Sequence, residues 1–208
     1  MVKRKGLLLV VSGPSGAGKG TICKEVLLKN KDINLSVSAT TRNPREGEVD
    51  GVNYFFLSKE KFTEMIENNE LLEHAQIYGN YYGTPKSAIM EKLENGQDVI
   101  LEIEMQGAKQ VKEFYPQGVF IFVLPPSLKE LNSRLVGRGT ETEEEIEGRF
   151  SCAFEEIKRI DDYDYFIVNK DVDLSVKELE EIISAERNKV TRYKEHIIEK
   201  FKEELQEC

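Results

Sequence analysis

The sequence GPSGAGKGT, residues 13–21, closely follows the apolar run LLLVV at residues 7–11. A continuous apolar run of this length is typical of a strand buried on both faces. The residues after the glycines have a helical pattern up to about Asn30. A glycine-rich loop between such a strand and a helix directs backbone N–H groups and the positive end of the helix dipole to one point. Lys19 adds a compact positive charge there, so the stretch predicts a phosphate-binding loop rather than a plain turn.

All nine residues of this loop are predicted to line the phosphate site. They are Gly13, Pro14, Ser15, Gly16, Ala17, Gly18, Lys19, Gly20 and Thr21. In the general motif a Ser or Thr directly follows the lysine and binds Mg²⁺. Here that position is Gly20, and the hydroxyl comes one residue later. We therefore expect Thr21 to bond a phosphate oxygen, and Mg²⁺ to be held by nucleotide phosphates and water.

Strand-like and helical segments alternate along the rest of the chain. The further apolar runs lie at residues 98–103, 119–124 and 165–168. This alternation favours an α/β fold with a central, mainly parallel sheet. Together with the phosphate-binding loop, it predicts a P-loop NTPase-type three-layer fold. Residues 175–208 contain neither Pro nor Gly, and their apolar residues recur at helical spacing. We expect one long C-terminal helix there, packed on the sheet.

Two segments interrupt this alternation. Residues 35–89 are rich in Ser, Thr, Tyr and Gly and predict a small insertion with short strands and a helix at 59–68. Residues 127–149 become dense in charge after residue 137 and predict a helical lid. We expect a single domain over residues 1–208. Its core would comprise residues 1–34, 90–126 and 150–208.

Composition and charge narrow the class of protein. A chain of 208 residues, 39% hydrophobic and 32% charged, is typical of one soluble domain. The net charge of −9 disfavours non-specific binding to nucleic acid and to anionic membranes. No apolar run is long enough to span a bilayer.

The cysteines indicate a reducing compartment. Cys23, Cys152 and Cys208 are far apart and show no C-x-x-C spacing, which favours neither a disulfide framework nor a zinc site. We therefore expect a cytoplasmic protein. The sequence leaves its oligomeric state open and assigns no role to Cys208.

Five further segments combine with the loop to resemble the guanylate kinase family. They are SVSATTRNPREGE (36–48), GVNY (51–54), GNYYGT (79–84), IEMQGA (103–108) and RLVGRGTE (134–141). The resemblance covers nearly the whole chain, and the first segment is far more specific than the loop. It implies an enzyme that transfers the γ-phosphoryl group of ATP to GMP, with Mg²⁺ as cofactor and dGMP as a further candidate acceptor.

The resemblance also implies three groups of site residues. Those expected to hold the GMP phosphate are Ser38, Arg42, Arg45, Tyr54 and Tyr82. Those expected to read guanine are Glu73, Thr84 and Glu104. Those expected to act on the transferring phosphoryl group are Lys19, Arg134, Arg138 and Arg149. Asn169 is expected on the adenine side, and Glu102 is expected to contact the metal only through water.

The chemistry of these residue types fits the implied reaction. Guanine presents adjacent N1–H and N2–H donors, which match the two oxygens of a carboxylate such as Glu73. Adenine has no N–H at N1, so it would leave a buried carboxylate unpaired and be rejected. The GMP phosphate is already an anionic nucleophile, so no general base is needed. Arg134 and Arg138 are four residues apart on a predicted helix and hence share one face.

Three alternatives compete with this interpretation. The first is another P-loop kinase, acting on AMP or a small metabolite, which Glu73 and Thr84 disfavour. The second is a catalytically silent guanylate kinase-like binding module, which the intact loop lysine disfavours. The third is a regulatory GTPase, but residues 169–173 only loosely echo the Asn-Lys-x-Asp element that reads guanine in such proteins.

The lid arginine Arg138 leads to a kinetic prediction. Arg138→Ala should lower turnover much more than GMP affinity, because the positive charge is needed as charge moves in the transition state. Steady-state kinetics with ATP and GMP measure both quantities. Unchanged turnover would contradict the assigned role.

Overall fold

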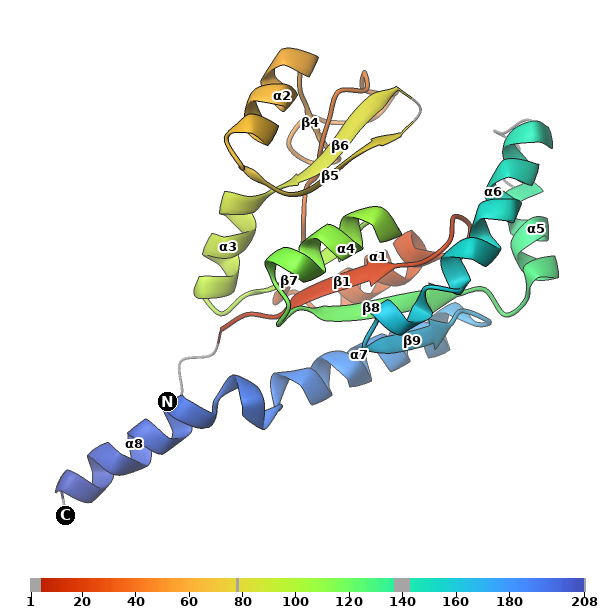
Figure 1. The fold of residues 1–208 in the computed structure, drawn as a ribbon. Helices are drawn as coiled ribbons and strands as arrows, with labels where there is room; N and C mark the ends of the chain where they lie inside the picture. The colour runs from red at the N-terminus through yellow and green to blue at the C-terminus, as the bar shows by residue number, and fades with distance from the viewer. Residues whose placement is uncertain (1–4, 78, 137–142, 208) are drawn as a thin grey trace.

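The computed structural model describes residues 5–77, 79–136 and 143–207 (Figure 1). Its main sheet has five strands, and every neighbouring pair is parallel. Their order across the sheet is β2 (Ile33–Leu35), β7 (Asp98–Glu102), β1 (Leu8–Ser12), β8 (Val119–Leu124) and β9 (Tyr165–Val168). The predicted α/β fold with a parallel sheet is confirmed. The short edge strand β2 is an addition to the four predicted strands.

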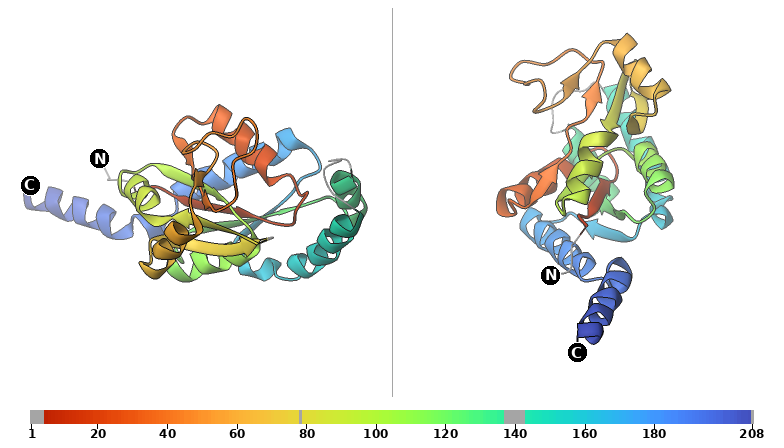
Figure 2. Two further views of the ribbon diagram at one scale, coloured as in Figure 1. Left: turned by 90° about the horizontal axis from the view of Figure 1, so that it is seen from above. Right: turned by 90° about the vertical axis from the view of Figure 1, so that its left-hand side faces the viewer.

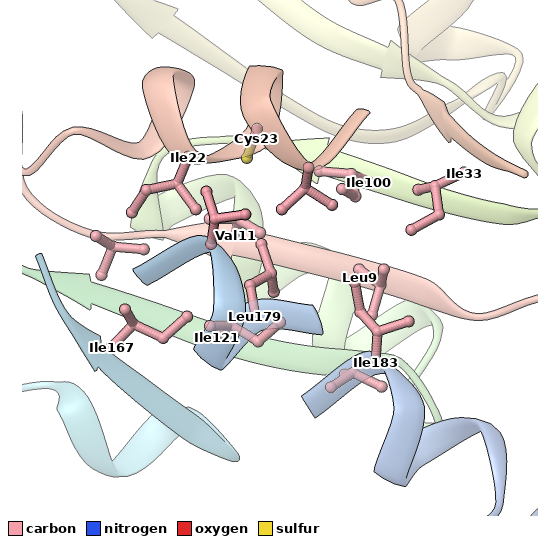
Figure 3. Close-up of a cluster of buried hydrophobic side chains, with 14 of the residues drawn as sticks. Leu9, Val11, Ile22, Cys23, Ile33, Ile100, Ile121, Ile167, Leu179 and Ile183 are labelled. Atoms are coloured by element: carbon pink, nitrogen blue, oxygen red, sulfur yellow. The ribbon is translucent and has the colours of Figure 1, made fainter. Parts of the chain in front are cut away.

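Helices cover both faces of this sheet (Figures 1 and 2). One face carries α1 (Lys19–Lys29) and α7 (Val172–Arg187), and the other carries α3 (Lys86–Glu94) and α4 (Met105–Phe114). In β1, Leu9 and Val11 pack towards α1 and α7, as Figure 3 shows. Leu8 and Val10 pack towards α3 and α4. The apolar run is continuous because both faces of β1 are buried.

The insertion forms a second, smaller sheet that stands beside the main one (Figure 1). Its strand order is β4 (Phe55–Phe56), β3 (Ala39–Thr40), β6 (Asn80–Pro85) and β5 (Leu71–Ile77). The helix α2 (Lys59–Glu67) begins at Ser58, whose hydroxyl accepts a hydrogen bond from the Lys61 N–H. Phe62 from α2 is fully buried in a small core of its own.

Two helices form the region predicted to be the lid. They are α5 (Leu128–Val136) and α6 (Glu143–Ile157), and they pack through Leu131, Leu135 and Ala153. The helix α6 continues beyond residue 149, and α3 spans residue 89, so the proposed domain limits fall inside helices. A short 3₁₀ turn, η1 (Ile160–Asp162), leads from α6 to β9.

The C-terminal region differs from the prediction of one long helix. The helix α7 ends at Asn188, a turn η2 (Val190–Arg192) follows, and α8 (Lys194–Glu207) begins a separate helix. The Asn188 side chain donates to the Ser184 carbonyl, and the β-branched pair that follows at residues 190–191 favours helix poorly. Of these helices only α7 packs into the buried clusters of the described chain. Within the described ranges, none of the helices is both long and apolar enough to cross a membrane.

Candidate nucleotide site

The loop between β1 and α1 has a backbone conformation that favours glycine at three positions, Gly13, Gly16 and Gly18. Gly13 and Gly18 have φ angles of 141° and 93°, which L side chains rarely adopt. A Cβ atom at Gly13 would lie 2.2 Å from the Val123 carbonyl oxygen. At Gly18 it would lie 2.1 Å from Nδ2 of Asn169. The loop is therefore pressed against β8 on one side and against the residue after β9 on the other.

Lys19 lies at the centre of this loop. Its side chain is nearly buried, and Nζ donates to the Gly13 carbonyl at 2.5 Å and to the Pro14 carbonyl at 3.3 Å. The ammonium group is thus held by the loop's own backbone, at the point where the N-terminus of α1 adds positive potential. An anion bound at this loop would meet both sources of positive charge.

Asn169 supports the loop from below. Its Nδ2 donates to the Ala17 carbonyl at 2.8 Å, and its Oδ1 accepts from the Ser175 hydroxyl at 3.3 Å. Arg134 of α5 donates to the Asn169 carbonyl at 2.9 Å. Only 3% of Asn169 is exposed. The structure therefore places this residue under the loop, with both ends of its amide in use, rather than open towards a base.

Gly20, which stands where the general motif has a hydroxyl residue, lies close to an acidic side chain. A Cβ atom at Gly20 would lie 3.2 Å from Oε1 of Glu102, at the end of β7. A side chain at this position would require the Glu102 carboxylate to shift by a few tenths of an ångström. Desolvation raises the pKa of Glu102 above its usual value, and the positive charge of Lys19 opposes that rise.

A cavity of about 350 Å³ joins the main sheet to the insertion. The predicted site residues that line it are Lys19, Ser38, Tyr54, Glu73, Tyr82 and Glu104. Glu102 also faces this cavity. Residues as far apart in the sequence as Lys19 and Gly107 therefore line one space.

Glu73 of β5 is the most unusual group in this cavity. Only 6% of it is exposed, and one carboxylate oxygen accepts the Thr84 hydroxyl proton at 2.7 Å. Burial raises the pKa of Glu73 to about 7, against a smaller lowering by the Thr84 hydrogen bond. Because a hydroxyl has one proton, Thr84 in this arrangement orients Glu73.

Gly107 of α4 makes room for the same carboxylate. A Cβ atom there would lie 2.5 Å from Oε2 of Glu73. The quoted segment IEMQGA contains this glycine, but nothing in the sequence pairs it with Glu73. The contact joins a helix of the main sheet to a strand of the insertion.

Gln110 fixes the same strand and was not among the predicted residues. Its Oε1 accepts from the His74 N–H at 3.1 Å, and its Nε2 donates to the His74 carbonyl at 2.9 Å. The side-chain amide thus pairs with the backbone of His74 as a neighbouring strand would. Its position one turn after Gly107 is the only sequence signal, and that position resembles an ordinary helix surface.

The two predicted phosphate-binding arginines behave differently. Arg42 forms an ion pair with Glu48 at 2.8 Å and lies 5.5 Å from the centre of the Tyr54 ring. The Arg42 hydrogen bond lowers the pKa of Glu48. The Arg45 backbone N–H donates to the same carboxylate at 2.7 Å, while its side chain is exposed. Glu48, which was not among the predicted residues, therefore provides the anion held here.

Of the three predicted lid arginines, Arg134 is the one whose side chain the structure describes. Arg134 lies against the loop, with an ion pair to Glu130 at 3.1 Å and a contact to Ala17 at 3.5 Å. Arg138 lies outside the described residues. The backbone of Arg149 is part of α6, but its side chain is not among those that the structure describes.

Among the residues that the structure describes, no set of three or more His, Cys, Asp or Glu side chains is arranged to hold a metal ion. Ser15 and Thr21 lie in the loop and its helix, where their backbone N–H groups contribute to the loop's positive end.

Comparison with known proteins gives one consistent family. The family model described as "Guanylate kinase" matches residues 5–186. The guanylate kinase of Clostridioides difficile (strain 630) is 77% identical over 205 residues, which cover 99% of this chain and all of that protein. The guanylate kinase of Caldanaerobacter subterraneus subsp. tengcongensis is 56% identical over 93% of this chain and 94% of its own length. The crystal structure of guanylate kinase from Anaplasma phagocytophilum has a TM-score of 0.76 at 34% identity, covering 92% of this chain and 91% of that one.

The burial of Glu73 predicts a pH-dependent stability. The folded pKa of about 7 lies above the value of 4.5 for a free glutamate, so the folded state binds the proton more tightly. Protonation of Glu73 stabilises the folded state. This stabilisation is present in full below pH 4.5 and is lost as the pH rises through 7. As the pH rises, the free energy of unfolding of Glu73→Gln should therefore increase relative to that of the wild type, by up to about 3 kcal/mol.

Urea unfolding at pH 5 and pH 8 tests this expectation. Glu67→Gln, at an exposed position of α2, controls for the loss of a carboxylate as such. An equal difference between Glu73→Gln and the wild type at both pH values would show that Glu73 is not held as a buried acid.

Proposed function

This chain belongs to the guanylate kinase family, and on that premise we propose that it transfers the γ-phosphoryl group of ATP to GMP, giving ADP and GDP. One observation supports the proposal at the level of particular residues. The buried carboxylate of Glu73 and the loop ammonium of Lys19 line the same cavity. The first suits a guanine base and the second suits a phosphate chain, so the two reacting nucleotides would meet between them.

The ionised carboxylate of Glu73 would recognise guanine. Its two oxygens would accept the N1–H and N2–H of the base, while Thr84 holds one oxygen and Gly107 leaves room for the other. Burial makes the lone carboxylate costly, and the guanine donors offset that cost. A base without an N–H at N1 would not offset the unfavourable free energy of burying the carboxylate. This difference in binding free energy would be the source of specificity. Glu104, which lines the same cavity, would also contact guanine.

The GMP phosphate would be held at the insertion. Ser38, Tyr54 and Tyr82 line the cavity with hydroxyl groups. Arg42 lies beside Tyr54 and already binds the Glu48 carboxylate, which has the charge and geometry of a phosphate edge. We infer that the phosphate takes over Arg42 from Glu48, and that the exposed side chain of Arg45 turns to join it.

ATP would lie with its phosphates in the loop. The backbone N–H groups of residues 13–21 and the Lys19 ammonium provide the positive surroundings. Mg²⁺ fits the oxygen ligands available here, because Glu102 places a carboxylate next to the loop lysine and one or two carboxylates with phosphates and water suffice. When bound, the ion supplies charge neutralisation between the phosphates. Glu102 would contact the ion through water.

The reaction itself needs little covalent chemistry from the protein. An oxygen of the GMP phosphate forms a bond to the γ-phosphorus of ATP, and the bond to the leaving oxygen of ADP breaks. Lys19 and the lid arginines Arg134, Arg138 and Arg149 would stabilise the charge on the transferring group. Closure of α5 and α6 over the loop would exclude water, which otherwise competes for the phosphoryl group.

The alternative functions fit the described site less well. A kinase for AMP would face the unpaired Glu73 carboxylate, and a silent binding module would not need the enclosed loop lysine. The buried thiol of Cys23, whose pKa burial raises, suits the reducing conditions of the cytoplasm, the location that we propose.

A parallel acceptor assay tests the proposed function. ADP release would be followed with ATP and Mg²⁺ while GMP, dGMP, AMP, CMP and UMP are offered separately. We expect rapid release with GMP and at least about 1,000-fold lower efficiency with AMP, because the buried carboxylate stays unpaired. Activity with AMP instead of GMP would overturn the proposal. The absence of activity with every acceptor would overturn it as well. Lys19→Met, which removes the loop charge, should abolish activity with every acceptor.

The contact between Gly107 and Glu73 gives a second prediction for this site. Gly107→Ala should displace the Glu73 carboxylate and weaken GMP binding by about 2 kcal/mol, roughly 30-fold, while the helix itself is favoured. Isothermal titration with GMP measures the loss. Gln106→Ala, at the exposed neighbouring position of α4, is the matched control and should bind like the wild type. Equal affinity for Gly107→Ala would show that Glu73 does not read the base.

A further inference from the structure

The strand β5 lies at the edge of the insertion's sheet and contacts α4 (Figure 1). An edge strand presents backbone N–H and C=O groups that no neighbouring strand pairs. At His74 both groups are bound by one side chain, the amide of Gln110 from α4, at 3.1 Å and 2.9 Å. A carboxamide has both an acceptor and a donor, so it can satisfy a backbone N–H and C=O together. The insertion is thus attached to a helix of the main sheet through its backbone.

The attachment point directly follows a β-bulge. Leu71 is paired with Pro85 and His74 with Gly83, so three steps along β5 correspond to two along β6. A bulge of this kind inserts one extra residue and changes the direction in which a side chain points. The bulged segment contains Glu73. The direction of the Glu73 side chain therefore depends on the irregular backbone on which it lies.

The neighbours of the bulge fit closely around Glu73. On β6, a Cβ atom at Gly83 would lie 2.8 Å from the Glu73 carbonyl oxygen, and the Thr84 hydroxyl donates to the carboxylate at 2.7 Å. On α4, Gly107 leaves room for the second carboxylate oxygen, Oε2. The carboxylate thus has one neighbour on the insertion and one on the main sheet. Its position depends on where β5 lies relative to α4.

Gln110 fixes this relative position. Gly107 and Gln110 are three residues apart and therefore lie on one side of α4. The first faces the Glu73 carboxylate, and the second binds the backbone of the next residue, His74. A shift of β5 by one residue would turn Glu73 to the opposite face of the strand. The two hydrogen bonds to His74 oppose such a shift, because it would break both of them.

We propose that Gln110 is a positioning residue for base recognition, an inference that rests on the proposed function. By holding His74, Gln110 keeps both oxygens of the Glu73 carboxylate directed at the base. The site can then distinguish a purine with adjacent N1–H and N2–H donors from a purine that has the N1–H alone. Gln110 acts on the backbone of β5 and not on the nucleotide.

Loss of this attachment would affect the acceptor and leave the donor site unchanged. Without the two hydrogen bonds to His74, the Glu73 carboxylate would occupy several orientations, of which one accepts from both guanine donors. GMP would bind less tightly, while the loop around Lys19 would keep its own contacts to the Gly13 and Pro14 carbonyls. A loss of this kind raises the KM for GMP with little effect on kcat.

Kinetics with GMP and with inosine monophosphate (IMP) test the proposal. IMP has the N1–H but no amino group at position 2, so it leaves one Glu73 oxygen unpaired. The ratio of kcat/KM for GMP to kcat/KM for IMP therefore measures how well the second oxygen is placed. Gln110→Met should lower this ratio about tenfold and raise the KM for GMP, with the KM for ATP unchanged. Partial unfolding would lower both activities equally and leave the ratio as it is.

Two further variants accompany this measurement. Gln117→Met, the same substitution at an exposed position between α4 and β8, is the matched control and should keep the wild-type ratio. Gln110→Glu has the same shape and keeps an acceptor for the His74 N–H, but its carboxylate cannot donate to the His74 carbonyl. It should also lower the ratio, and it takes the place of Gln110→Met if that variant does not fold. An unchanged ratio in a folded Gln110 variant would overturn the proposal.

A double-mutant cycle tests whether Gln110 acts through Glu73. In a Glu73→Gln background the carboxylate is absent, so Gln110→Met should change the GMP-to-IMP ratio by less than about twofold. A change as large as in the wild-type background would show that Gln110 acts by another route, which contradicts the proposal.

The wild-type assay separates this inference from the proposed function. A wild type that does not use GMP as an acceptor would overturn the proposed function, and the positioning role of Gln110 with it. A wild type that prefers GMP, together with Gln110 variants of unchanged ratio, would overturn the positioning role alone.

Discussion

The close approach of the phosphate loop to its neighbours is the constraint on which the rest of the structure depends. Gly13 presses on the Val123 carbonyl, and Gly18 presses on the Asn169 amide. These contacts require β1 to lie beside β8 and β9 to end beneath the loop, as the sheet order provides. The same Asn169 links the loop to Arg134 of the lid helix α5. A side chain at either glycine would thus disturb the sheet edge, the loop and the lid together.

The second constraint is the buried carboxylate of Glu73. Burial is unfavourable for an ionised group, and here the surroundings support it incompletely, with one hydroxyl donor and no described ion pair. The structure maintains this arrangement through Gly107, which leaves space for the carboxylate, and Gln110, which fixes the neighbouring backbone. In the function that we propose, part of the stability of the fold is in this way exchanged for recognition of a ligand that brings two donors.

Prediction from the sequence succeeded where a feature is local. The run at residues 7–11 and the glycines after it define a strand, a loop and a helix within one stretch, and the resemblance placed the family. Prediction failed for features that depend on contacts between distant segments. Gln110 resembles a surface residue until β5 lies beside it, and the role of Gly107 appears only with Glu73 in place. The apolar periodicity of residues 175–208 continues past Asn188, so it conceals the end of α7.

The proposed recognition of guanine requires Glu73 to be a buried acid that ionises when guanine binds, and one measurement tests this requirement directly. The side-chain carboxyl carbon of Glu73 can be titrated by ¹³C NMR in the free protein and in the presence of saturating GMP, with Glu73→Gln identifying the resonance. We expect a pKa of about 7 for Glu73 in the free protein and a clearly lower pKa in the complex, because the guanine donors stabilise the charged form. An ordinary glutamate pKa in the free protein, unchanged by GMP, would contradict it.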